Sequence, residues 1–99
     1  MATVTDIGQL IYRDPKIRGG RPCVAGTGIT VHRIVQWHKM GQAPEEIAED
    51  YPHLSLAQVH AALAYYYANH DEVERELLAE EEEERRLYEE HRNRKGPSA

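Results

Sequence analysis

Residues 44–63 read PEEIAEDYPHLSLAQVHAAL, and this stretch decides the fold. Pro44 suits the first position of a helix, because the N–H that proline lacks has no helical partner there. The two glutamates that follow it complement the positive end of the helix. Pro52 disfavours helical geometry at Tyr51, so a short helix is expected over residues 44–51.

A longer helix is expected to begin at Ser55. Ser55 and Gln58 have the spacing of a capping box, and Leu54 and Val59 have that of a hydrophobic staple. The helical period then predicts a buried stripe and an outer face of small, nearly neutral residues. The stripe is Val59, Ala62, Leu63 and Tyr66, and the outer face is Gln58, His60, Ala61, Ala64 and Tyr65.

Upstream, the stretch VHRIVQWHKM at residues 31–40 predicts another helix. Thr30 is available as its N-cap and Gly41 as its C-terminal stop. The residues at helical spacing are Val31, Ile34, Val35 and His38. Before this helix, residues 7–13 and 21–24 have the composition of two short strands, so we expect a small β-hairpin.

Catalytic and metal-binding templates do not fit the sequence. The bend Gly26-Thr27-Gly28 lacks the lysine of a P-loop and the third glycine of a dinucleotide fold. The six histidines include no H-x-x-x-H pair, and the glutamate run lacks the pattern of a calcium loop. The spacing of the single cysteine, Cys23, from His32 fits no template of nucleophile and base. We therefore expect no enzyme activity, no metal and no cofactor.

Charge is distributed unevenly along the chain. Residues 1–43 carry a net charge of +4, whereas residues 71–90 carry eleven acidic side chains and a net charge of −8. The acidic run predicts a helical arm with favourable i, i+4 pairs, Glu81 with Arg85 and Glu82 with Arg86. The asymmetry indicates either partners of opposite charge or a solvated helix face.

The short helix, the bend at residues 52–54 and the longer helix have the order of a helix-turn-helix unit, whose second helix enters the major groove of DNA. Gln58 would pair with adenine and Ala61 would contact a thymine methyl. No lysine or arginine lies between residues 55 and 70, so phosphate contacts are expected from the basic N-terminal third. The predicted DNA-binding residues are Arg13, Lys16, Arg18, Arg21, Arg33, Gln58 and His60.

The stretches DPKIRGGRPCVAGTGITV and PEEIAEDYPHLSLAQVHAALAYYYANHDEVE closely resemble the bacterial and archaeal family called domain of unknown function 433. The D-P, G-G-x-P, G-T and Y-P-x-L-S marks fall in the family's order. The resemblance implies a small homeodomain-like helix-turn-helix fold and an antitoxin encoded beside a PIN-like ribonuclease toxin. The chain differs at Gly28, where the family usually has arginine, and at Ala43, where a capping serine or threonine is usual.

Together these observations predict a mainly α fold with an N-terminal β-hairpin, a helix-turn-helix core of three helices and an extended acidic C-terminal helix. We expect a domain over residues 1–70, and over residues 71–99 an acidic arm that ends in a disordered tail. The expected function is a DNA-binding antitoxin that neutralises a PIN-like ribonuclease toxin and represses its own operon. The alternative is a helix-turn-helix regulator or adaptor without a toxin partner. The apolar anchors predicted for the toxin are Val73, Leu77, Leu78, Leu87 and Tyr88.

A chain of 99 residues fits one domain with a small core. Its large side chains exceed what such a core covers, which predicts a homodimer. The side chains in question are Trp37, Tyr65, Tyr66, Tyr67 and Leu77. The sequence shows no signal segment and no apolar run of membrane length, so the expected location is the cytoplasm, without a membrane partner.

Overall fold

Residues 7–95, the part of the chain that this computed structural model describes, contain four α-helices, one two-stranded hairpin and two short 3-10 helices, η1 (Ile7–Leu10) and η2 (Arg18–Gly20). The side chains are described for residues 7–93. The helices are α1 (Val31–Lys39), α2 (Pro44–Asp50), α3 (Leu56–Ala68) and α4 (His70–Lys95), and the strands are β1 (Ile11–Tyr12) and β2 (Cys23–Val24). No helix in this range combines the length and the apolar character needed to cross a bilayer. The mainly helical class and the hairpin are as predicted.

The ends of α1 follow the predicted local signals. The Oγ1 atom of Thr30 accepts a hydrogen bond from the N–H of Arg33 at 3.1 Å, which satisfies one donor of the first turn. At the other end Gly41 has a φ of 95°, and its N–H donates to the carbonyl of His38 at 3.1 Å. The next N–H, from Gln42, donates to the carbonyl of Trp37, which completes a Schellman motif.

The two helices of residues 44–68 also begin where the sequence predicts. Ser55 Oγ accepts from the N–H of Gln58 at 3.1 Å, and Gln58 Oε1 accepts from the N–H of Ser55 at 2.8 Å. Only half of such a box forms at α2, where Glu46 Oε1 accepts from the N–H of Ala43. The methyl side chain of Ala43 accepts no hydrogen bond in return.

The hairpin is shorter than predicted. β1 pairs antiparallel with β2, with Ile11 opposite Val24 and Tyr12 opposite Cys23. Pro22 has no N–H to extend the ladder on one side, and Gly26 turns the chain with a φ of 79° on the other. The segment Ile7–Leu10 therefore lacks a strand to pair with and forms a 3-10 helix, η1. The predicted extent of the first strand, residues 7–13, is wrong in this respect.

One apolar core joins all four helices. It consists of Val24, Val31, Ile34, Val35, Ile47, Leu54, Val59, Ala62, Leu63, Tyr66, Val73 and Leu77. The predicted stripe of α3 is confirmed, since all four of its residues lie in this set. Val73 and Leu77 come from α4, so the first turns of the acidic helix pack against residues 7–69, which we call the head. The predicted boundary at residue 70 coincides with the start of α4.

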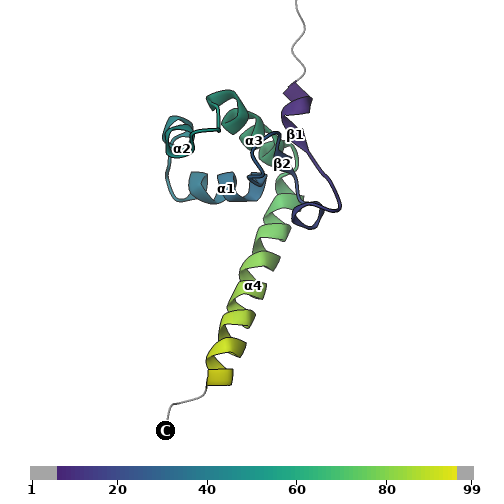
Figure 1. Cartoon of the computed structure of the whole chain (residues 1–99), viewed down its shortest axis with the longest axis vertical. Helices are drawn as coiled ribbons and strands as arrows, with labels where there is room; N and C mark the ends of the chain where they lie inside the picture. The colour runs from purple at the N-terminus through teal and green to yellow at the C-terminus, as the bar shows by residue number, and fades with distance from the viewer. Residues whose placement is uncertain (1–6, 96–99) are drawn as a thin grey trace, which may run out of the picture.

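Asn69 separates α3 from α4. Its φ of −127° and ψ of 39° are not helical, and its N–H donates to the carbonyl of Tyr65 at 2.9 Å. The chain restarts as α4, which runs past the head and projects away from it (Figure 1). This helix includes residues 93–95, which we expected in a frayed tail, whereas residues 96–99 of that tail lie outside the described part.

The core covers more aromatic surface than we expected. Tyr66 and Leu77 are buried, and Trp37 and Tyr65 are half-buried against the core. Among the five residues invoked for a dimer, Tyr67 alone is largely exposed, at 62%. The homodimer stays a prediction, and it loses much of the apolar surface on which it was based.

Candidate functional site

The basic N-terminal third and the acidic helix contact each other within the chain. Arg13 donates to the carboxylate of Glu72 at 3.3 Å, and Lys39 Nζ lies 2.6 Å from a carboxylate oxygen of Glu74. The guanidinium of Arg21 pairs with the carboxylate of Glu80. The first three turns of α4 thus neutralise cations of the head.

Arg13 is fixed by more than its carboxylate partner. Its Nε donates to the hydroxyl oxygen of Tyr65 at 3.1 Å, and its Nη1 donates to the carbonyl of Gly20 at 3.2 Å. The hydrogen bond to Tyr65 is the main cause that raises the pKa of Arg13. Its donors are engaged inside the chain, so Arg13 is a poor candidate for a phosphate contact.

The carboxylate of Glu74 makes two contacts between α4 and the head. It accepts hydrogen bonds from Lys39 Nζ, at 2.8 Å, and from the hydroxyl of Tyr66. These donors, Lys39 first, hold the pKa of Glu74 below its usual value. Burial, followed by the bond to Glu74, raises the pKa of Tyr66 to about 12. Lys39 and Tyr66 therefore secure the first turn of α4 against α1 and α3.

His32 is the buried polar residue of the head, with 2% of its surface exposed. Its Nε2 lies 3.5 Å from a carboxylate oxygen of Glu76, and neither ring nitrogen makes a hydrogen bond with any described residue. Desolvation lowers its pKa, although Glu80 and Glu76 act in the opposite direction. Cys23 is also fully buried, and burial raises the pKa of its thiol, so the thiolate form is disfavoured.

Three of the predicted DNA-binding cations make no ion pair among residues 7–93. They are Lys16, Arg18 and Arg33, and all three are exposed. Arg18 and Arg33 line one hollow, of about 460 Å³, together with Thr30, Trp37 and Tyr51. The structure thus brings two of the five predicted cations together and ties Arg13 and Arg21 to α4.

The residues predicted to read bases are placed less favourably for contact with DNA than the cations Arg18 and Arg33. Both polar atoms of the Gln58 side chain are engaged, because its Nε2 donates to the carbonyl of Ala25 at 3.1 Å while Oε1 caps the helix. Ala61 is 6% exposed, so its predicted place on the outer face of α3 is wrong. It is covered because the N-terminal segment of Ile7 to Tyr12 packs against this side of α3. His60 is exposed.

The predicted partner anchors divide into two groups. Val73 and Leu77 are buried in the chain's own core, so they offer no surface to a partner. Leu78, Leu87 and Tyr88 are exposed by 61%, 52% and 66%. Leu78 and Leu87 are nine residues apart, which places them on opposite sides of an α-helix. Leu87 and Tyr88 are adjacent along the helix, so a single partner surface can contact both.

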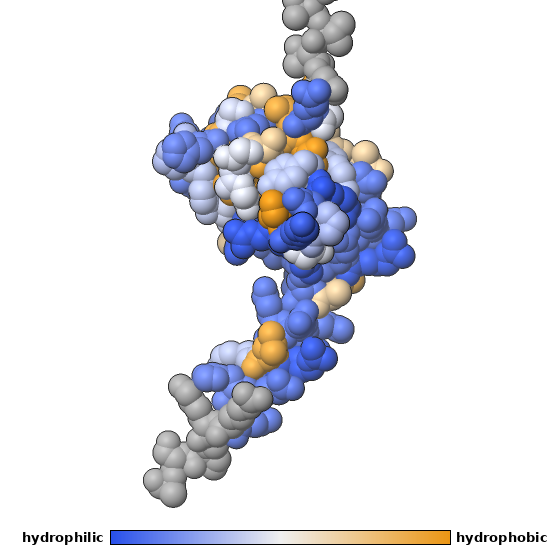
Figure 2. All heavy atoms as spheres, turned by 45° about the vertical axis from the view of Figure 1, so that its right-hand side comes forward, coloured by the Kyte–Doolittle hydropathy of each residue, from blue (hydrophilic) through white to orange (hydrophobic). Residues whose placement is uncertain are grey.

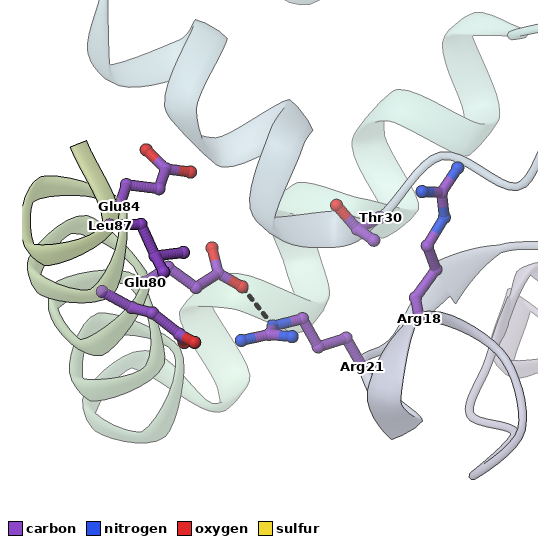
Figure 3. Close-up of a pocket in the computed structure, with 7 residues that line it drawn as sticks. Arg18, Arg21, Thr30, Glu80, Glu84 and Leu87 are labelled. Carbon is purple, nitrogen blue, oxygen red and sulfur yellow. Dashed lines mark ion pairs between the residues drawn. The ribbon is translucent and has the colours of Figure 1, made fainter. Parts of the chain in front are cut away.

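A second hollow, of about 350 Å³, lies between the head and α4. Arg21 extends across it to Glu80, whereas Arg18 lies on the side far from α4 and its guanidinium points away from Arg21 (Figure 3). Glu84 and Leu87 line it from α4, one and two turns beyond Glu80. This cleft marks the place where the buried face of α4 becomes accessible.

The projecting part of α4, residues 81–90, carries six carboxylates and two arginines. Figure 2 shows it as a largely hydrophilic rod with small hydrophobic patches. In the described structure none of these six carboxylates makes an ion pair or a hydrogen bond, and the predicted pairs Glu81–Arg85 and Glu82–Arg86 do not form. Sequence reasoning found this acidic surface from composition alone, but it missed the Arg18–Arg33 hollow, because nothing in the spacing of residues 18 and 33 shows that they meet.

Comparison with known proteins supports one family. Residues 11–66 match the family described as "Protein of unknown function (DUF433)". A similar solved structure is the crystal structure of a DUF433 member protein from Anabaena variabilis ATCC 29413, with a TM-score of 0.65 and 29% sequence identity. The similarity covers 70% of this chain and 68% of that one. No curated protein is significantly similar to the chain. Since the family match spans more than half of the sequence, the chain belongs to the DUF433 family.

Proposed function

We propose that this chain is an antitoxin-type regulatory protein, whose projecting acidic helix neutralises a ribonuclease toxin by occupying its basic RNA-binding cleft. The observation that carries the proposal is the division of α4. Its first turns are held in the head by Glu72, Glu74 and Glu80, and the carboxylates of residues 81–90 have no partner in the described structure. Unpaired charge of one sign on a projecting rod favours a partner of opposite sign.

The exposed apolar residues of the projecting part of α4, residues 81–90, supply the binding affinity that charge alone does not. Electrostatic complementarity raises the encounter rate and specificity more than affinity, so tight binding needs buried apolar anchors. Leu87 and Tyr88 are exposed and adjacent, and Leu87 borders the cleft against the head. We infer that a toxin surface contacts this pair while its basic residues meet Glu83 and Glu84.

Repression of its own operon by a homodimer with a homeodomain-like helix-turn-helix core is the second part of the proposal. Lys16, Arg18 and Arg33 are the predicted DNA-binding cations without an ion pair in the described structure. Of the residues predicted to read bases, His60 is exposed. Gln58 would have to leave its two hydrogen bonds to reach a base. DNA recognition through α3 thus requires a rearrangement of Gln58 that toxin binding by α4 does not require.

The test is neutralisation of the PIN-like ribonuclease toxin that this proposal expects to be encoded beside the chain. Replacing Glu82, Glu83 and Glu84 together with glutamine removes three unpaired charges from the rod. We expect binding to the toxin to weaken about tenfold or more, mainly through a slower association rate that depends on salt. The readouts are the association rate and the residual RNA cleavage at equal protein concentrations.

The matched control removes the same charge from α2, where Glu45, Glu49 and Asp50 are exposed. Changing these three to their amides should leave both readouts at the level of the unmodified chain. Equal effects of the two triple variants would mean that net charge alone matters and would refute the assignment to α4.

A further inference from the structure

The hollow beside the hairpin has an unusual charge. Arg18 and Arg33 both line it, no acidic residue of the described chain does, and its volume is about 460 Å³. Every other arginine or lysine between residues 13 and 39, apart from Lys16, pairs with a carboxylate of α4. Two neighbouring unpaired arginines are the side-chain set that proteins use for phosphate groups, because the planar guanidinium donates several hydrogen bonds in a fixed geometry.

The backbone at Arg18, which lines the hollow, has a left-handed conformation. Arg18 has a φ of 52°, in the left-handed region that non-glycine residues rarely adopt. Gly19 and Gly20 follow with φ values of 65° and 81°, so three consecutive residues turn the chain in the same sense. Strain of this kind persists where the surrounding structure enforces it and is frequent at binding sites.

One wall of the hollow is aromatic. The rings of Trp37 and Tyr51 are stacked, with centroids 4.5 Å apart and an interplanar angle of 26°. The guanidinium carbon of Arg33 lies 6.0 Å from the centre of the Trp37 ring. α1 and the residue that ends α2 supply these two rings, so the wall is held by two packed helices. Aromatic rings beside a pair of cations suit a ligand with both a planar ring and a negative charge.

Thr30 adds a hydrogen-bond donor to the set. Its Oγ1 accepts from the N–H of Arg33, and the hydroxyl hydrogen is left to donate into the hollow. The positive end of α1 lies at the same place, which favours an anion further. Because the donors are side chains, the site does not need the glycine loop of the nucleotide-binding templates that the sequence lacks.

We propose that this hollow binds one nucleotide, with the phosphate held by Arg18 and Arg33 and the base against Trp37 and Tyr51. The nucleotide is either a free mononucleotide or one unit of a single-stranded nucleic acid, since both present the same chemistry. The volume lies within the range of small-ligand sites, and a base reaches an aromatic wall only when it is unpaired. This site shares Arg18 and Thr30 with the hollow against α4, but binding of a nucleotide goes beyond the toxin-binding function.

Trp37 is the single tryptophan of the chain, so its fluorescence reports on this hollow directly. The full chain is titrated with AMP, with a single-stranded oligoadenylate, with the corresponding duplex and with inorganic phosphate. We expect a saturable change in Trp37 emission with AMP or with the single strand. Saturation by AMP identifies a mononucleotide site, and saturation by the oligonucleotide alone identifies a single-strand site; both support the proposal.

The double variant Arg18→Ala/Arg33→Ala should weaken this binding about tenfold or more, since each substitution removes a charge-assisted hydrogen bond to the phosphate. The matched control Arg75→Ala/Arg86→Ala removes the same charge from exposed positions on α4 and should bind as the unmodified chain does. Tyr51→Ala should weaken binding, whereas Tyr51→Phe keeps the ring and should retain it. Thermal unfolding checks that each variant is folded.

The proposal is overturned if neither AMP nor the single strand changes Trp37 emission in a saturable way. Equal binding by the two double variants would also contradict it. Binding of the duplex as tightly as the single strand would show that the protein contacts phosphates alone, and would refute the role of the aromatic wall. None of these results bears on toxin neutralisation, so failure of one proposal is distinguishable from failure of the other.

Discussion

His32 shows how one buried residue links the head to α4. The imidazole lies between α1 and α4, with Glu76 and Glu80 facing it from α4 and Arg21 and Arg13 acting from the hairpin side. Burial lowers its pKa below the usual value of about 6.5. From the sequence His32 appeared only as a histidine without a metal partner, because its burial depends on a helix that lies more than forty residues away.

This burial predicts a stability that depends on pH. Well above about pH 6.5 the imidazole is neutral in both folded and unfolded chains, and its contribution to stability is fully present. As the pH falls, the unfolded chain takes up the proton first, so the contribution is lost as the pH passes through the lower folded pKa. The free energy of unfolding should therefore fall more between about pH 7.5 and pH 5.5 in the unmodified chain than in His32→Leu.

Urea unfolding at the two pH values measures this difference, with His60→Leu as the control at an exposed histidine. The control should keep the pH dependence of the unmodified chain. An equal loss of stability in His32→Leu would show that the imidazole titrates alike in both states, contrary to its burial.

At the scale of elements, helix termini were the most predictable features. Thr30, Pro44 and Ser55 act within one turn of their own positions, so the sequence contains the whole signal. The strand predicted at residues 7–13 shortened because its pairing depends on a partner that Pro22 and Gly26 limit to two residues. Ala61 was misplaced for a similar reason, since its cover comes from a distant segment.

The start of α2 offers a stabilising substitution. Ala43 has a φ of −71° and a ψ of 154°, close to the −84° and 159° of the capping Ser55. A serine at this position can therefore accept a hydrogen bond from the N–H of Glu46 and complete the capping box. Ala43→Ser should raise the free energy of unfolding by about 1 kcal/mol.

Thermal or urea unfolding measures this gain, and Thr30→Ala serves as the opposite control. It removes an existing cap and should lower the free energy of unfolding by about the same amount. If Ala43→Ser leaves stability unchanged while Thr30→Ala lowers it, the hydrogen bond that Glu46 Oε1 accepts from the N–H of Ala43 already supplies all the stability that capping can give to the start of α2.

At the scale of the molecule, the charge asymmetry of the sequence has two parts. Part of it is internal, because Glu72, Glu74 and Glu80 neutralise cations of the head. The rest is carried on the projecting rod, where the carboxylates are unpaired. Composition predicted the total charge but not this division, since helical spacing shows which residues share a side and not which distant cations that side meets.

The division of α4 also shows where the chain can be cut without loss of the head. A chain that ends after Glu80 keeps Val73 and Leu77 in the core and keeps all three ion pairs of the head. It should unfold at nearly the same temperature as the full chain. A chain that ends after Asn69 loses both core residues and should be much less stable.

The most direct test of the proposal that the projecting helix neutralises a toxin compares the chain ending after Glu80 with the full chain. The measurement is the affinity of each for the PIN-like ribonuclease that we propose as its partner. The account predicts a folded protein whose dissociation constant is larger by about a hundredfold or more, because both the unpaired carboxylates and the anchors Leu87 and Tyr88 are gone. An unchanged dissociation constant would contradict the account and would place the toxin-binding surface on the head.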